Sequence, residues 1–117
     1  QVIKDTCKAG VNALINIIVG FPGETEKDFQ ETLEVIERNQ KYITGIGAIS
    51  VCLVNNDCDL DINYQDYGLV LAADLGVRAK EWSLVDGENN YETRRRRAEK
   101  TIELVNQLGL SYVTATL

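Results

Sequence analysis

The chain has 117 residues, a net charge of −6 and a sequence pI of about 4.6, and 44% of its residues are hydrophobic. This composition is typical of one modest globular domain. The negative charge disfavours a nucleic-acid partner, because no summed positive field would attract phosphates. No apolar run is long enough to span a bilayer, so we expect no membrane partner and a cytoplasmic location. The start at Gln1, without an initiator methionine, leads us to expect a fragment of a longer protein.

The cysteines Cys7, Cys52 and Cys58 lack the CxxC or CxxxCxxC spacing of metal sites, and the chain contains no histidine. This pattern argues strongly against a zinc site. An odd number of cysteines without a secretory signal favours reduced thiols. We therefore interpret all of them as structural side chains and predict no metal site within the chain.

The N-terminal part of the chain predicts a helix end followed by a strand. Residues 1–9 have a helical pattern that Gly10 would close. Residues 13–19 are almost continuously apolar and rich in Ile and Val, which predicts a strand buried on both faces, as in a parallel sheet. The run ends in the tight turn of residues 20–23, Gly-Phe-Pro-Gly, where proline and glycine interrupt regular structure.

A helix and a second strand follow this turn. Residues 25–28 have the spacing of a capping box, and an apolar stripe predicts a helix over 26–42. Residues 48–54 are again apolar and predict a second buried strand. A strand, a helix and a strand at this spacing predict a parallel βαβ unit with a right-handed crossover.

The remaining chain predicts a hairpin, a helix and a last strand. Residues 67–71 and 81–85 are β-prone and are expected to pair as an antiparallel hairpin with a long loop. A helix is predicted over 91–108, closed by Gly109. Residues 111–116 are β-prone and predict a terminal strand. The fold class is therefore α/β.

The turn after the first strand is a candidate binding site, because ligands of α/β folds lie at the carboxyl ends of such strands. It lacks the GxxxxGK[ST] pattern of a phosphate loop. Glu24, Glu26 and Asp28 would also repel an anion at the start of the helix. The glycines permit the approach of a neutral or cationic ligand; the alternative is a turn that only reverses the chain.

Four consecutive arginines, Arg94 to Arg97, lie in the predicted last helix, so one or two of them must face inward. Three interpretations stay open. The arginines form local ion pairs with Asp86, Glu88 or Glu92; they clamp a substrate or cofactor carboxylate; or they contact RNA. The aromatic residues around the hairpin either cover a sheet face or form a cofactor box; they are Trp82, Tyr64, Tyr67 and Tyr91.

These residues resemble a known family. Residues 16–25 (NIIVGFPGET), with Asp28-Phe29 and Thr32-Leu33, resemble the fifth strand and helix of radical SAM enzymes, in particular the branch with an N-terminal cobalamin-binding domain. Trp82, Asp86-Gly87, Asn89 and the four arginines are similar to the segment that follows the barrel in that branch. The resemblance implies that residues 1–54 are the C-terminal portion of a partial (β/α)6 TIM-like barrel, ending in its last βαβ unit. Residues 55–117 would be an extension of acidic loop, β-hairpin, helix and terminal strand.

The resemblance also implies cofactors. In this family a [4Fe-4S] cluster on an early CxxxCxxC loop reductively cleaves S-adenosylmethionine (SAM) to a 5′-deoxyadenosyl radical, and a GxIxGxxE motif on the fifth strand contacts the adenine. Ile18 and Gly20 match the Ile and the second Gly of that motif, Asn16 replaces its first Gly, and its acid falls one place late, at Glu24. We therefore expect Asn16, Ile18 and Gly20 to bind SAM, with Gly20 leaving room for the adenine edge. The cluster loop itself is absent from this sequence.

Two functional hypotheses follow. In the first, the chain supports SAM binding and closes the substrate side of the barrel in a full-length enzyme, and it is inactive alone. Its partner is then the missing N-terminal half of the barrel, with cobalamin as a candidate second cofactor and the substrate unknown. In the second, it is a non-catalytic α/β packing or interaction module. The isolated chain is also expected to expose apolar surface where the missing half-barrel belongs, and to form a homodimer through that face or through the sheet edge.

Overall fold

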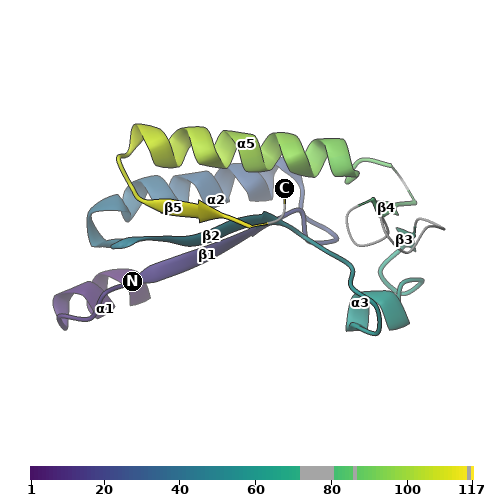
Figure 1. Ribbon diagram of the computed structural model, residues 1–117, viewed down its shortest axis with the longest axis horizontal. Coiled ribbons are helices and arrows are strands. Elements are labelled where there is room, and N and C mark those ends of the chain that lie inside the picture. Colours follow the sequence, from purple (N-terminus) through teal and green to yellow (C-terminus); the bar gives the residue numbers. More distant parts are fainter. Residues whose placement is uncertain (72–80, 86, 116) are drawn as a thin grey trace.

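The computed structural model describes residues 1–71, 81–85, 87–115 and 117. The molecule measures 46 × 24 × 23 Å, with the main sheet and its helices toward one end and a small hairpin at the other (Figure 1). In chain order the elements are α1 (Val2–Lys8), β1 (Leu14–Val19), α2 (Glu26–Arg38), the 3₁₀ helix η1 (Gln40–Tyr42), β2 (Gly45–Val51), α3 (Asp59–Ile62), β3 (Leu69–Val70), β4 (Ser83–Leu84), α5 (Tyr91–Gln107) and β5 (Tyr112–Thr114).

The main sheet has three strands in the order β1-β2-β5. β1 pairs in parallel with β2, from Leu14 opposite Gly45 to Val19 opposite Val51, and β2 pairs in parallel with β5. The predicted parallel βαβ unit is confirmed. The terminal strand lies on the other side of β2, so residues from both predicted segments, 1–54 and 55–117, share one sheet. Within the described residues this sheet is open and no barrel is present.

The second strand starts earlier than predicted, at Gly45 rather than residue 48, and ends at Val51 rather than residue 54. Its glycines are not strand breakers but sites of close approach. A Cβ on Gly45 would lie 2.6 Å from Ser111 Oγ, and a Cβ on Gly47 would lie 2.5 Å from Asn16 Oδ1. Glycine is therefore needed inside this strand because neighbouring side chains fill the space of its missing one.

Helices α2 and α5 lie on the same face of the sheet (Figure 1). The strands contribute Ile17, Val19, Ile46, Ile49 and Val51 to the core between them, and the covering residues are Ile36, Ile43, Ala98 and Val105. In β1 alternate residues point to this face, as the two-residue period of a strand requires. In β2 a register shift opposite Ile15 and Asn16 adds one residue between Ile46 and Ile49. Burial of these aliphatic side chains is the main force that holds the helices on the sheet.

The opposite face of the sheet is exposed, so the prediction of a strand buried on both faces is wrong. Leu14 is 66% exposed, Ile18 62% and Val113 62%. The apolar run alone could not show this, because α2 and α5 both cover the same side and leave the alternate residues bare. We call this surface the open face. It carries Leu14, Asn16 and Ile18 of β1, and Val113 of β5.

The ends of the helices follow their capping signals. Gly10 and Gly109 have φ values of +81° and +70° at the ends of α1 and α5, as predicted for closing glycines. The helix predicted over 26–42 stops at Arg38, and a separate 3₁₀ turn covers Gln40–Tyr42. Asn39 causes this break, because its side-chain amide donates to the Val35 carbonyl at 2.8 Å and competes with the next helical turn.

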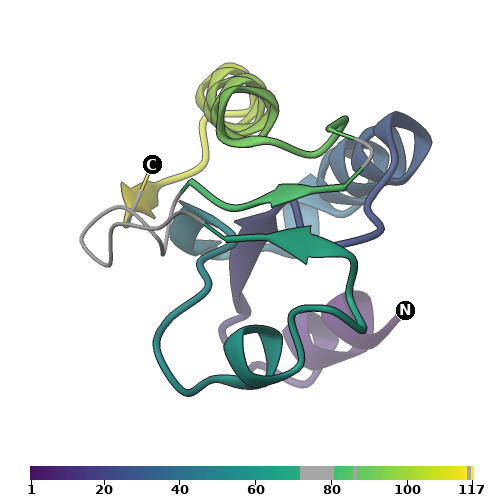
Figure 2. The ribbon, with the colours of Figure 1, turned by 90° about the vertical axis from the view of Figure 1, so that its right-hand side faces the viewer.

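A second small core lies beyond the carboxyl ends of the strands. Figure 2 shows the hairpin in front of the sheet, with α5 above it and α3 below. β3 and β4 pair antiparallel, Leu69 opposite Leu84, as predicted; residues 72–80, which would form the predicted loop, lie outside the described part of the chain. The short helix α3, inside the predicted acidic loop, was not anticipated. This core contains Cys52, Val54, Leu60, Leu69 and Trp82.

Candidate functional site

The turn after β1 is held in a shape that requires glycine. Gly20 and Gly23 have φ values of +87° and +95°, which side chains rarely tolerate. The N–H of Glu24 donates to the Phe21 carbonyl at 2.9 Å and closes the turn. α2 begins directly afterwards with the predicted capping box. The Thr25 N–H donates to the Asp28 carboxylate at 2.9 Å, and the Asp28 N–H donates to the Thr25 hydroxyl oxygen at 3.1 Å.

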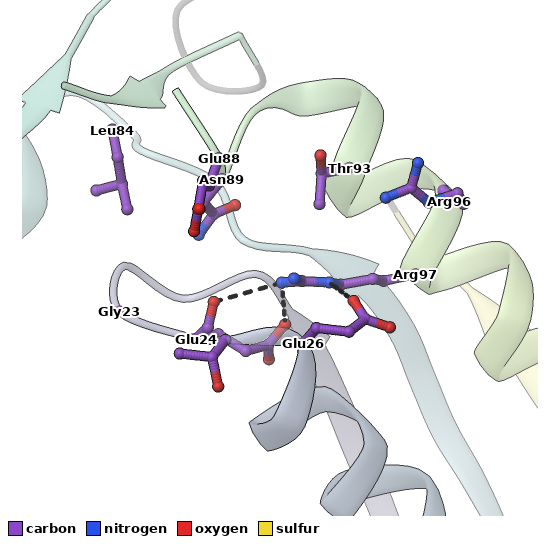
Figure 3. Close-up of a pocket in the computed structure, with 10 residues that line it drawn as sticks. Gly23, Glu24, Glu26, Leu84, Glu88, Asn89, Thr93, Arg96 and Arg97 are labelled. Carbon is purple, nitrogen blue, oxygen red and sulfur yellow. Dashed lines mark hydrogen bonds and ion pairs between the residues drawn. The ribbon is translucent and has the colours of Figure 1, made fainter. Parts of the chain in front are cut away.

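Glu24 bonds the protein on two sides, and Figure 3 shows its contact with Arg97. Its Oε1 accepts from the Gly20 N–H at 3.2 Å and from Arg97 Nη1 at 3.0 Å. Arg97 Nε also donates to Glu26 Oε2 at 3.2 Å. Burial raises the pKa of Glu24, although the Gly20 N–H and Arg97 act in the opposite direction. The acidic side chain that falls one place late in the family motif therefore bonds the turn backbone and a side chain of α5.

Asn89 is a second tie on the same turn. Its side chain is 2% exposed. Nδ2 donates to the Gly20 carbonyl at 2.9 Å and to the Phe21 carbonyl at 3.3 Å, and Oδ1 accepts from Arg94 Nη1 at 3.1 Å. The orientation of the amide follows from these partners, because only its NH₂ group can face two carbonyl oxygens.

Arg94 is fully buried and packs directly on Gly20. A Cβ on Gly20 would lie 2.2 Å from Arg94 Cγ. The guanidinium carbon lies 3.7 Å from the centre of the Trp82 ring, and Nη2 donates to the Trp82 carbonyl at 2.7 Å. Burial lowers the pKa of Arg94 to about 10, which leaves it charged at neutral pH. Its aliphatic stem therefore fills the space at the turn while its head group binds the hairpin.

The four arginines are divided as the helix prediction requires. Arg94 and Arg97 are buried, whereas Arg95 and Arg96 are exposed. Arg95 pairs with Glu99 at 3.4 Å, a local ion pair on the helix surface. Arg97 pairs with acids from the turn and α2 that the sequence analysis did not name as partners. Of the acids that it did name, Asp86 lies outside the described residues.

The predicted SAM contacts are divided between the open face and the turn. Asn16 and Ile18 lie on the open face, and Ile18 lines a hollow of about 340 Å³ at the strand ends, together with Phe21, Ser50, Val51, Cys52, Leu53 and Asn55. Gly20 lies in the turn, where the stem of Arg94 fills the space that a side chain on Gly20 would occupy. The role of each of these residues in cofactor binding stays a prediction.

The aromatic residues around the hairpin mostly have packing roles. Trp82 is buried, and its Nε1 donates to the Cys52 carbonyl at 3.0 Å. Tyr67 donates its hydroxyl to Asp59 and meets Phe21 edge-on, with ring centres 6.5 Å apart. These contacts favour the interpretation that Trp82 and Tyr67 fasten the hairpin beneath the strand ends.

The described residues contain no group of three or more His, Cys, Asp and Glu side chains that could hold a metal ion. Cys7 is exposed, Cys52 is buried and Cys58 is partly buried, and burial raises the pKa of Cys52 to about 11. An iron–sulfur cluster therefore does not fit this part of the chain. None of the described helices has the length and apolar character of a membrane span.

Sequence reasoning missed the ties on the turn. Asn89 entered only through the family resemblance, and Arg94 was predicted only as one of four helical arginines of which one or two face inward. The bond from Asn89 to the Gly20 carbonyl joins residues 69 positions apart. No local pattern encodes such a contact; the signal available was the presence of arginines at inward-facing positions of a helix.

Comparison with known proteins gives short matches to tRNA-2-methylthio-N(6)-dimethylallyladenosine synthases. The synthase of Syntrophomonas wolfei is 62% identical over 29 residues, which are 25% of this chain and 6% of that protein. The synthase of Mycobacteroides abscessus is 78% identical over 23 residues, 20% of this chain and 4% of its own length. That of Bifidobacterium adolescentis is 82% identical over 22 residues, 19% and 5% respectively. No protein-family profile and no solved structure matches the chain.

These matches span 4 to 6% of the relatives' lengths. The synthases are a radical SAM family. The radical SAM resemblance is therefore supported over a short segment. The matches contain no support for the cobalamin-binding branch in particular.

Proposed function

We propose that this chain is the C-terminal portion of a radical SAM barrel together with its extension, and that it supports SAM binding and closes the substrate side of the barrel. Alone it is inactive. The observation that carries the proposal is the open face, which presents Asn16 and Ile18 beside a hollow at the carboxyl ends of β1 and β2. Ligands of parallel α/β folds lie at such strand ends.

The exposed apolar side chains support this assignment. Leu14, Ile18 and Val113 lie on one face of a parallel sheet whose strands are usually covered on both faces. The missing N-terminal half of a barrel would cover that face. The alternative, a non-catalytic packing or interaction module, uses the same surface for a protein partner and needs no cofactor.

The residues of the chain fit part of a SAM site. Ile18 offers an apolar contact for a flat ring, and Ser50, which lies opposite Ile18 in the register, also lines the hollow. Bound SAM would supply the radical chemistry, and the cluster that starts it would come from outside these residues. Cobalamin, if the parent belongs to that branch, would likewise bind outside them.

The test of the proposal uses the full-length reading frame that contains this chain. We expect an upstream CxxxCxxC motif, and formation of 5′-deoxyadenosine after reconstitution with iron, sulfide and reductant. The isolated 117-residue chain, treated identically, should form none. A reading frame without the motif would favour the non-catalytic alternative. Formation of 5′-deoxyadenosine by the isolated chain would contradict the proposal that it is inactive alone.

A matched pair of substitutions tests the site. Ile18 and Ile62 are exposed to similar extents, 62% and 66%, but only Ile18 lies at the hollow. In the full-length protein we expect Ile18→Asn to weaken SAM binding about tenfold and Ile62→Asn to leave it unchanged, as measured by calorimetric titration. Equal affinities for SAM in both variants would remove Ile18 from the site.

We also propose that this chain itself does not contact nucleic acid, although the relatives are tRNA-2-methylthio-N(6)-dimethylallyladenosine synthases by name. The net charge of −6 and the burial of Arg94 and Arg97 support this. We expect no shift of labelled tRNA by the isolated chain at low salt, and a salt-dependent shift would contradict the proposal.

Self-association of the isolated chain is a further part of the proposal. β1 is an edge strand in the order β1-β2-β5, and its open face is apolar. Unpaired edges and bare apolar faces favour association. We expect a dimer in sedimentation velocity at high concentration, weakened by Leu14→Lys. A monomer at every concentration would contradict this.

A further inference from the structure

The turn after β1 is held from outside by residues that come much later in the chain. Asn89 donates to the carbonyls of Gly20 and Phe21. Arg94 in turn holds Asn89 at two points, its backbone carbonyl at 3.0 Å and its side-chain Oδ1 at 3.1 Å. We call Asn89 and Arg94 the lock.

Both residues of the lock are buried at the turn. Asn89 and Arg94 are 2% and 0% exposed, respectively. Buried polar groups of this kind are costly to leave without partners, so their bonds favour one arrangement of the turn strongly. The stem of Arg94 lies where a side chain on Gly20 would be, so packing and hydrogen bonding fix the same residue.

A series of hydrogen bonds connects Arg94 of α5 to the ends of β2 and β1. Arg94 donates to the Trp82 carbonyl at 2.7 Å, and the Trp82 ring N–H donates to the Cys52 carbonyl at 3.0 Å. The Cys52 N–H donates to the Val19 carbonyl at 2.7 Å. Val19 is the neighbour of Ile18, so the series ends at the edge of the hollow.

We propose that Asn89 and Arg94 are positioning residues that set the Gly20 backbone and the strand ends of β1 and β2 in the shape that the SAM site requires. This inference rests on the proposed function. Under this proposal the C-terminal extension, residues 55–117, helps to shape the cofactor site. Asn89 and Arg94 do not line the hollow that Ile18 lines, and they act through the turn.

The first measurement needs no SAM. In the 117-residue chain, amide hydrogen exchange measured by NMR reports the Gly20 N–H, which bonds Glu24, and the Glu24 N–H, which bonds Phe21. Asn89→Asp keeps the shape and the acceptor for Arg94 but loses the donor. We expect about tenfold faster exchange at both amides, the effect of losing buried hydrogen bonds, and unchanged exchange at Ile49 in the centre of the sheet.

Arg94→Lys is the second variant, and it keeps the charge and the aliphatic stem while losing the planar fork. It should also speed exchange at the turn, and it preserves the test if Asn89→Asp fails to fold. The matched controls are Asn106→Asp and Arg95→Lys, at exposed positions of α5. Both controls should exchange at wild-type rates.

The second measurement is SAM affinity of the full-length protein with the same variants. We expect about tenfold weaker binding for Asn89→Asp and Arg94→Lys and no change for the controls. Wild-type exchange at Gly20 in a folded variant overturns the lock, whether or not SAM binds. Faster exchange with unchanged SAM affinity overturns the positioning role. Absence of SAM binding by the wild-type full-length protein overturns the proposed function instead, and the exchange data separate these cases.

Discussion

The four neighbouring arginines on α5 differ in burial: two are buried and two are exposed. Arg94 and Arg97 are 0% and 7% exposed, and each holds part of the turn after β1. Arg95 and Arg96 face outward, and Arg95 has a surface ion pair with Glu99. The residue type and the local sequence are the same, so the difference arises from the roughly 100° rotation per residue of a helix and from what lies across from each side.

The comparison shows why a run of one residue type should not be interpreted as one feature. A buried arginine needs partners for its donors and a flat surface for its plane, and Arg94 has both in Asn89 and Trp82. An exposed arginine is solvated and contributes little to folding. Substitutions along the run should therefore differ widely in effect, and the following predictions use that spread.

The largest effect is expected for Arg94→Ala. The substitution removes the stem that packs on Gly20, the stack on Trp82 and the hydrogen bonds to Asn89 and Trp82. We expect the free energy of unfolding to fall by about 4 kcal/mol, as for other large buried side chains. Urea denaturation measures this, with Arg96→Ala as control. A loss below about 1 kcal/mol would mean that the buried and exposed arginines are equivalent.

Gly20→Ala should follow closely. The new methyl group meets Arg94 Cγ at 2.2 Å, and the φ of +87° is unfavourable for alanine. We expect a loss of about 3 kcal/mol from strain and overpacking together. In the double variant with Arg94→Ala, the overpacking disappears. The loss of stability in the double variant should therefore be smaller than the sum of the losses in the two single variants. Strict additivity in denaturation experiments would show that the two residues are not in contact.

A pH-dependent effect is expected for Glu24, the partner of Arg97. Because burial raises its pKa above the ordinary value of 4.5, the folded chain keeps this proton to a higher pH than the unfolded chain does. The contribution of Glu24 to stability is therefore complete below about pH 4.5 and is lost as the pH rises through the folded pKa.

Glu24→Gln removes this dependence, so the stability of the wild type relative to the variant should fall as the pH rises above about 4.5. Glu26, whose pKa is lowered by its bonds to Gln30 and Arg97, contributes with the opposite sign. Denaturation curves across this pH range should show the difference between the two proteins directly. A relative stability of the wild type that rises with pH would contradict the assigned direction.

The smallest effect is expected for Arg95→Ala. Its ion pair with Glu99 joins side chains that are 54% and 57% exposed, where water and salt screen the charges. We expect a loss below about 0.5 kcal/mol in thermal denaturation, independent of Gly20. A loss comparable to that of Arg94→Ala would end the distinction between the two sides of the helix.

Local patterns predicted much of the fold. The apolar run of β1, the stripe of α2 and the capping box of Thr25 and Asp28 gave the parallel βαβ unit, because each depends on residues within one or two helical turns. The closing glycines Gly10 and Gly109 also matched their positions. The pairing of β3 with β4 was predicted from two β-prone runs.

The features that failed or were missed depend on contacts between distant parts of the chain. An apolar strand does not reveal that helices cover only one of its faces, so β1 is predicted from its sequence to be buried on both, whereas Leu14 and Ile18 are exposed. The early start of β2 depends on Asn16 and Ser111 filling the space above its glycines. For the candidate site, the sequence indicated the turn but not the ties from Asn89 and Arg94, and the roles of Asn16, Ile18 and Gly20 in binding SAM stay predictions.

Trp82 is the only tryptophan of the chain, and its ring lies under the guanidinium of Arg94 and beside the carbonyl of Cys52. Its fluorescence is therefore an optical reporter placed inside the lock. A buried indole against a cation should emit at short wavelength and change its intensity when the charge withdraws or water enters. Opening of the turn could then be followed by stopped-flow emission in unlabelled protein, at concentrations too low for NMR, and timed against the arrival of a ligand at the strand ends.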